Sequence, residues 1–110
     1  MTIQEQYENL EKTVRGYNPA ADFQHIRAAF EFAAEAHKDQ KRKSGEPYII
    51  HPLAVAQIVA EELRLDSESI EAALLHDVIE DTAATHEQVS KLFSPTIADL
   101  VEGVSKLTRI

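Results

Sequence analysis

Hydrophobic residues recur every three or four positions along most of this 110-residue chain, which is the spacing of one face of an α-helix. The pattern predicts a first helix over about residues 2–14 and a second from Pro19 to about Asp39, with Asn18 as the N-cap of the second. The buried stripe of the second helix is expected to contain Phe23, Ile26, Phe30, Ala33, Ala34 and His37. We interpret His37 as a packing or hydrogen-bonding residue at the end of that stripe.

Four more helices are predicted after a loop over residues 40–50, which contains the turn sequence Ser44-Gly45-Glu46-Pro47. Proline or a capping residue marks where each helix begins: Pro52, Asp66 or Ser67, Thr85, and Ser94-Pro95. The residues expected to face the core are Tyr7, Leu10 and Val14 in the first helix, Val55, Ile58, Val59 and Leu63 in the third, and Ile70, Ala73, Leu74 and Val78 in the fourth. The sixth helix carries an apolar stripe of its own, made of Ile97, Leu100, Val101, Val104 and Leu107. Apart from residues 48–50, no segment alternates strictly between apolar and polar residues. We therefore predict an all-α fold, an irregular bundle of about six helices in one domain.

The amino-acid composition and net charge of the chain exclude several kinds of site and location. The chain has no cysteine, which excludes disulfides and thiolate zinc sites and fits a cytoplasmic location. Its apolar runs are far shorter than the ~20 residues that a membrane-spanning helix needs. The net charge of −8 argues against binding along a nucleic-acid backbone. One basic cluster over residues 38–43 is an exception, and it could hold a small anionic ligand.

The candidate chemistry is concentrated in an acidic run that follows an apolar segment at residues 72–75. If the fourth helix continues through Thr82, four side chains share one face at roughly 0°, 100°, 40° and 140°: His76, Asp77, Glu80 and Asp81. Neighbouring carboxylates repel, and a bound divalent metal ion would turn that repulsion into ligation. A solvated helix face is the commoner meaning of such a stripe. Because His51 lies upstream at the start of the third predicted helix, which directly precedes the fourth, we instead expect His51, His76 and Asp77 to converge on a metal ion.

Three longer segments carry a family resemblance: residues 42–52, 73–82 and 100–108. An upstream histidine followed about 25 residues later by a His-Asp pair resembles the HD superfamily of metal-dependent phosphohydrolases. The amino-acid sequences of all three segments resemble those of the amino-terminal hydrolase domain of RelA/SpoT homologues, and the resemblance covers roughly residues 20–110. Those enzymes make and destroy the guanosine alarmones ppGpp and pppGpp in the stringent response.

The resemblance implies a reaction and a set of site residues. The reaction removes pyrophosphate from the ribose 3′ position and leaves GDP or GTP. The implied residues are His51, His76 and Asp77 as three of four ligands to Mn²⁺, Glu80 and Asp81 as the pair that positions or activates water, and Arg42, Lys43 and Ser44 as the loop that binds the guanine nucleotide. The H-D-x-x-E-D segment is intact here, which the resemblance associates with hydrolase-competent members.

The family's fourth ligand, an aspartate, falls beyond Ile110, so we expect residues 1–110 to be the amino-terminal part of a single HD hydrolase domain. An incomplete domain would leave the apolar stripe of residues 95–110 uncovered, which predicts self-association through that segment. Two alternatives stay open for the function. One is an HD phosphohydrolase acting on another nucleotide, and the other is a catalytically silent nucleotide-binding or assembly module.

Overall fold

The computed structural model describes the backbone of residues 1–108 and the side chains of residues 1–103. Within that part of the chain the elements are α1 (Ile3–Tyr17), α2 (Phe23–Ala36), α3 (Ile50–Ile58), the π-helical segment η1 (Val59–Leu63), α4 (Ser67–Leu75), α5 (Val78–Asp81), α6 (His86–Leu92) and α7 (Pro95–Thr108). The described residues form no strand, only an isolated bridge between Lys41 and Pro47. The prediction of an all-α bundle is confirmed.

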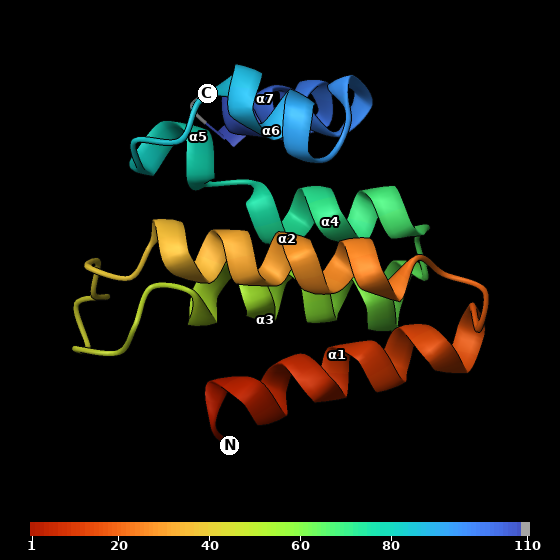
Figure 1. Cartoon of the computed structure of the whole chain (residues 1–110). Coiled ribbons are helices and arrows are strands. Elements are labelled where there is room, and N and C mark those ends of the chain that lie inside the picture. Colours follow the sequence, from red (N-terminus) through yellow and green to blue (C-terminus); the bar gives the residue numbers. More distant parts are fainter. Residues whose placement is uncertain (109–110) are drawn as a thin grey trace.

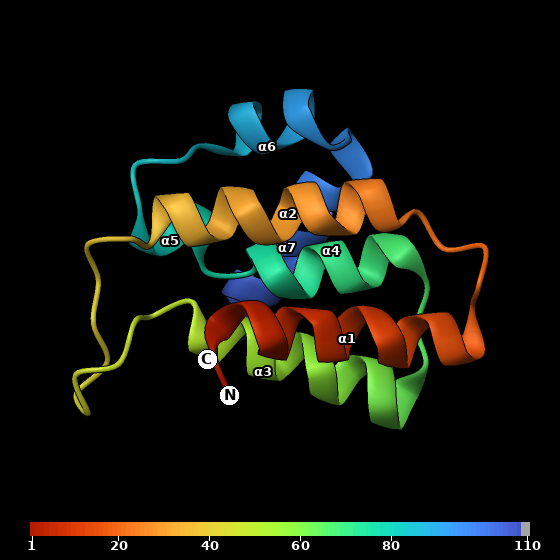
Figure 2. The same ribbon diagram turned by 60° about the horizontal axis from the view of Figure 1, so that its bottom comes forward.

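Helix α4 is the centre of the bundle. It packs against α2, α3 and α7, and Ile70, Leu74 and Leu75 on it have no exposed surface. Helices α1 and α6 lie on opposite sides of the helical bundle, and the loop between α2 and α3 projects to one side (Figures 1 and 2). None of the described helices is both long and apolar enough to cross a membrane.

The two ends of α2 differ from the prediction. Asn18 is the C-cap of α1, and its N–H donates to the carbonyl of Val14 over 2.7 Å, so it cannot also begin the next helix. The N-cap of α2 is Asp22, whose carboxylate accepts from the N–H of His25. The helix ends at Ala36 rather than near Asp39. His37 follows as a buried C-cap residue with its Nδ1 2.6 Å from Gln40 Oε1, as expected for a packing and hydrogen-bonding role.

The predicted core face of the third helix is wrong for Ile58 and Leu63, whereas Val59 is partly buried and packs against the core. Helix α3 begins at Ile50, and Pro52 lies in its first turn, where a missing N–H costs nothing. The face that packs inward carries Leu53 and Ala56, and continues with Ala60 in η1, all buried and at helical spacing. The small side chains of the two alanines let α1 and α4 approach closely. Two residues expected to be buried are largely exposed instead: Ile58 at 58% and Leu63 at 61%.

The acidic run is not one helix. Helix α4 ends at Leu75, and α5 is a single turn that begins at Val78. His76 and Asp77 lie at the break between them, with Asp77 at φ −99° and ψ −4°. The angles expected for one continuous helix therefore do not apply, and the directions of the two side chains are set by this bend.

Helix α7 packs back on its own bundle. Ile97 and Val101 are buried against it, at 2% and 0% exposure, so the expectation of a wholly uncovered stripe is wrong for these two residues. Leu100 is 42% exposed. The side chains of Val104 and Leu107 lie outside the described residues.

Candidate metal centre and its basic loop

Three of the predicted site residues come together at one end of α3 and α4. The connection over residues 64–66 folds α4 back along α3 and η1, so that the start of α3 meets the end of α4. Asp77 Oδ2 lies 3.1 Å from His76 Nε2 and 3.6 Å from His51 Nε2, and the three ligand atoms are all within 4.8 Å of one another. Ligand atoms that share one metal ion at about 2.1 Å lie roughly 3 to 3.5 Å apart, which is close to this spacing. The predicted convergence of these three residues is confirmed; that they bind a metal ion stays a prediction.

The chemistry of the three atoms also fits a cation. His76 Nδ1 lies 2.7 Å from the carbonyl of Ala73, which requires that Nδ1 carry the proton and donate. In the neutral ring Nε2 is then a lone-pair acceptor that faces the carboxylate of Asp77. Three acceptor atoms that converge in this way repel one another unless a proton or a metal ion lies between them. A second hydrogen bond that fixes the tautomer of a histidine is usual for metal ligands.

The electrostatic environment shifts the pKa values of the three groups in different directions. Burial lowers the pKa of His51, and the neighbouring His76 and Arg42 add to that effect against the attraction of Asp77. Burial opposes charge on His76 too, but its hydrogen bonds to Asp77 and to the Ala73 carbonyl outweigh burial and raise its pKa. Burial would raise the pKa of the Asp77 carboxyl, yet hydrogen bonds from His76 and Tyr48 hold it below the usual value. The arrangement is therefore an ionised carboxylate that faces imidazole nitrogens.

The two predicted catalytic carboxylates lie on α5, one turn beyond the candidate metal ligands. Asp81 Oδ2 is 3.4 Å from the hydroxyl of Tyr48, which itself contacts Asp77. Glu80 is exposed on the same helix and is not among the three residues whose ligand atoms meet. The structure thus connects Asp81 to the candidate centre through Tyr48, whereas the role expected for Glu80 stays a prediction.

The basic segment forms a tight hairpin beside this centre. The N–H of Arg42 donates to the carbonyl of Glu46 over 2.8 Å, and the N–H of Gly45 donates to the carbonyl of Arg42 over 2.8 Å. Gly45 has φ +89°, a conformation that residues with a Cβ rarely adopt. Side chains from this hairpin line an open cavity of about 630 Å³: Lys41, Arg42, Lys43, Ser44, Glu46 and Tyr48.

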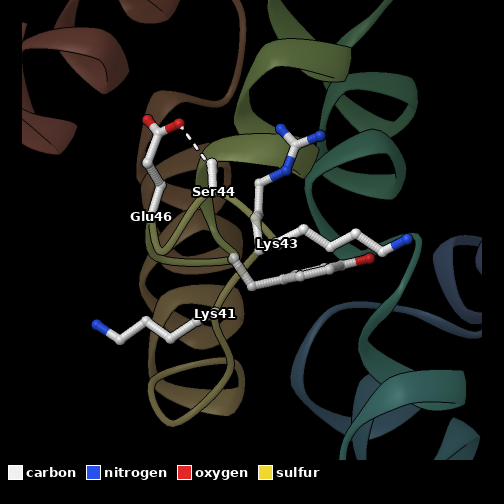
Figure 3. A pocket seen from close by; sticks show the side chains of 6 residues that line it. Lys41, Lys43, Ser44 and Glu46 are labelled. Carbon is white, nitrogen blue, oxygen red and sulfur yellow. Dashed lines mark hydrogen bonds between the residues drawn. The ribbon is translucent and has the colours of Figure 1, made fainter.

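Figure 3 shows how the side chains of this cavity lie. Lys41 and Lys43 extend in opposite directions from the loop, and the Ser44 hydroxyl donates to Glu46 Oε1 over 3.1 Å. All three residues expected to bind the nucleotide line the cavity. Burial is the main cause of the lowered pKa of His51, and the positive charge of Arg42 adds a smaller contribution, so the cavity and the candidate metal centre are electrostatically connected.

An apolar cleft of about 470 Å³ borders the same two histidines. It is lined by His51, Val55, Val59, Leu65, Ser69, Ala72, Ala73, His76 and Leu100. The mostly apolar lining lowers the local dielectric constant near the imidazoles. Interactions between charges at the candidate metal centre are correspondingly stronger than they would be in water.

A second group of potential ligands was not anticipated from the sequence. His86 Nε2 lies 3.0 Å from Asp99 Oδ1 and 3.5 Å from Glu102 Oε2, between the start of α6 and α7. The pair of acidic residues three positions apart on one helix was the available signal. The Asp99 side chain is 74% exposed, compared with 17% for that of Asp77. Exposure of this kind suits a surface ion pair better than a metal centre.

Sequence reasoning also missed the residues that support the centre from behind. Tyr48 bonds to Asp77, and Gln40 bonds both to the ring of buried His37 and to the backbone carbonyl of Asp81. Both residues flank the basic hairpin. No periodic or charge signal distinguishes them, because their role depends on contacts with residues 29 to 41 positions later in the chain.

The chain was compared with known proteins. Its residues 29–110 match the family described as HD domain. It is 50% identical over 104 residues to the bifunctional (p)ppGpp synthase/hydrolase SpoT of Escherichia coli (strain K12), a match that covers 94% of this chain and 15% of that protein. It is 52% identical over 103 residues to the guanosine-3′,5′-bis(diphosphate) 3′-pyrophosphohydrolase of Aquifex aeolicus (strain VF5), covering 94% of this chain and 14% of that protein. The chain therefore spans only about a seventh of the length of these curated relatives.

A solved structure is similar as well. It is that of a metazoan ortholog of SpoT that hydrolyzes ppGpp, and it matches with a TM-score of 0.70 at 38% sequence identity. The match covers 74% of this chain and 47% of the other. Together with the matched family over residues 29–110 and the resemblance of its segments to RelA/SpoT homologues, this shows that the chain belongs to the HD domain family.

Proposed function

We propose that this chain carries the hydrolase site of an enzyme that removes pyrophosphate from the ribose 3′ position of ppGpp or pppGpp, with Mn²⁺ as the metal. The observation that carries the proposal is the convergence of His51, His76 and Asp77 in a chain about half identical to proteins named for that reaction. The fit of the basic hairpin to an anionic ligand supports it. Histidine and carboxylate ligands suit Mn²⁺ but also suit other divalent ions, so the choice of metal rests on the family resemblance.

The proposed chemistry divides among three groups of residues. His51, His76 and Asp77 hold the metal ion, which when bound supplies charge neutralisation and a more acidic water. Asp81, with Glu80 beside it on α5, accepts the proton that leaves the attacking water. The water attacks the phosphorus bonded to the ribose 3′ oxygen, and as that bond breaks the 3′ oxygen takes up a proton from solvent, which leaves GDP or GTP and pyrophosphate. Arg42 and Lys43 bind the base and phosphates, because a guanidinium plane stacks on aromatic rings and both side chains pair with anions.

The test uses the product of the complete reading frame, so that every residue of the protein is present. Pyrophosphate release from ppGpp, from pppGpp and from GTP is measured with and without Mn²⁺. We expect metal-dependent release from the two alarmones and none from GTP, and loss of at least 100-fold in His76→Ala. His86→Ala, which removes the histidine of the second group of potential ligands, is the matched control and should retain activity. Equal release from ordinary nucleotides would replace the alarmone assignment with another phosphohydrolase activity.

We also propose a cytoplasmic location, which suits a guanine nucleotide substrate and a chain without cysteine.

We further propose self-association through residues 95–110. The apolar surface available for it is smaller than expected, because Ile97 and Val101 are already buried within the chain. Leu100 and the apolar cleft that it lines are the remaining described surface for such a contact. Sedimentation of the chain at low and at high micromolar concentration tests it. A single monomeric species throughout would contradict self-association.

A further inference from the structure

The hydroxyl of Tyr48 lies between two carboxylates at the candidate metal centre. It is 2.8 Å from Asp77 Oδ2 and 3.4 Å from Asp81 Oδ2. The acceptor atom on Asp77 is the same oxygen that faces the imidazoles of His51 and His76. A phenol has one proton to donate, so the shorter contact makes Asp77 the principal acceptor and leaves Asp81 as the second.

The ring of Tyr48 is fixed by its surroundings rather than by the hydroxyl alone. It packs against the buried ring of His37, with centroids 4.7 Å apart, and edge-on against His51 at 5.8 Å. The N–H of Tyr48 donates to the carbonyl of Gln40 over 3.1 Å. The Gln40 side chain in turn bonds to His37 Nδ1 and to the carbonyl of Asp81. Tyr48 therefore has little freedom to move its hydroxyl away from Asp77.

The hydroxyl is the donor in both contacts, because an ionised carboxylate can only accept a hydrogen bond. A neutral phenol that faces two carboxylates can stabilise their ionised form, because it supplies a proton to the hydrogen bond without adding a competing charge.

We propose that Tyr48 is a positioning residue that holds the Asp77 carboxylate in the orientation needed for metal binding and couples that ligand to Asp81. The proposal rests on the proposed function for the identity of the metal, but its geometry is independent of the substrate. Hydrogen-bond partners that orient a metal ligand typically change metal affinity by about 10- to 100-fold when they are removed. Tyr48 also lines the cavity of the basic hairpin, so one side chain links the anion-binding loop to the metal ligand.

The test compares two substitutions that each remove one phenol oxygen. Tyr48→Phe keeps the ring stacked on His37 and removes only the hydroxyl at Asp77. Tyr17→Phe is the matched control, since its hydroxyl donates to the backbone carbonyl of Leu65 over 2.7 Å. Both are prepared in the His86→Ala background, which removes the second group of potential ligands. The dissociation constant for Mn²⁺ is measured from the free-ion signal in electron paramagnetic resonance, after the metal-free melting temperature of each variant is recorded.

We expect Tyr48→Phe to weaken Mn²⁺ binding by about 10- to 100-fold and to alter the spectrum of the bound ion, whereas Tyr17→Phe leaves both within a factor of two. Similar melting temperatures for the two variants would exclude a purely structural effect, and affinities are compared where both are fully folded. An unchanged Mn²⁺ affinity in Tyr48→Phe, or equal weakening in Tyr17→Phe, overturns the positioning role. So does a reference protein that binds no Mn²⁺.

The same samples separate this inference from the proposed function. Weaker Mn²⁺ binding in Tyr48→Phe, together with no release of pyrophosphate from ppGpp by the unsubstituted protein, supports the positioning role and contradicts the substrate. Normal alarmone hydrolysis by the unsubstituted protein, together with unchanged Mn²⁺ affinity in Tyr48→Phe, supports the proposed function and contradicts the positioning role.

Discussion

A buried carboxyl group on α4 should make the stability of this protein depend on pH. Glu71 is 1% exposed, and its Oε1 has no hydrogen-bond partner among the described residues. Burial, followed by the negative charges of Asp22, Glu68 and Asp66, raises the pKa of Glu71 to about 7 from a usual 4.5. Among the described residues, the ion-pairing neighbour is His25, whose Nδ1 lies 3.5 Å from Oε1 and whose side chain is 46% exposed.

The sign and size of the effect follow from linkage. Between pH 4.5 and about 7 the folded state keeps the proton of Glu71 while the unfolded state has lost it, so folding stability falls as the pH rises. Each unit of pKa difference is worth about 1.4 kcal/mol, which gives an upper limit of about 3.5 kcal/mol for the whole interval. Stability from this group is therefore complete below pH 4.5 and absent above about pH 7.

Glu71→Gln removes the ionisation and keeps the shape. The free energy of unfolding of both proteins is measured with urea at several values of pH from 5 to 8, and the difference between them is plotted, because the titration of all other groups then cancels. We expect the variant to gain up to about 3 kcal/mol on the wild type as the pH rises across this range. Glu62→Gln, an exposed residue of η1 that is not among the charges raising the pKa of Glu71, is the control and should stay within about 0.5 kcal/mol. A difference for Glu71→Gln that does not change with pH would refute the reasoning.

Three further predictions concern the core, a helix cap and the catalytic pair. Leu53→Ala should cost about 2 to 5 kcal/mol of unfolding free energy and Ile58→Ala less than about 1, measured by urea unfolding, since only Leu53 is buried; equal costs would mean that the core face of α3 is assigned wrongly. Thr85→Ala should cost about 1 kcal/mol in the same assay, because Thr85 and Gln88 form a reciprocal capping box at the start of α6; a variant as stable as the wild type would show that the box contributes nothing. Glu80→Ala in the full reading frame should abolish alarmone hydrolysis and leave Mn²⁺ affinity within about threefold; loss of metal binding together with activity would make Glu80 a ligand instead.

Local sequence patterns determined the helical class and several helix ends of this protein. The reciprocal cap at Thr85 and the acceptor role of Asp66 at the start of α4 depend on residues three positions apart, so they are visible in a short window. The adjacency of His76 and Asp77 likewise guaranteed that two potential ligands would lie near one another, and the helical repeat identified the buried stripes of α1 and α2.

Tertiary packing decided the rest. Helix α3 is apolar on nearly all sides, so its sequence does not show which face is buried. The packing of α1 and α4 against it buries Leu53 and Ala56 and leaves Ile58 exposed. The local pattern favours one continuous helix, but the chain bends at His76. The His76 ring therefore lies next to the ring of His51, which comes from α3. Tyr48 gains its role only through a contact 29 positions away. Patterns within a few residues report which backbone shape is favoured, but the meeting of distant side chains depends on how all the helices exclude water together, which no single segment determines.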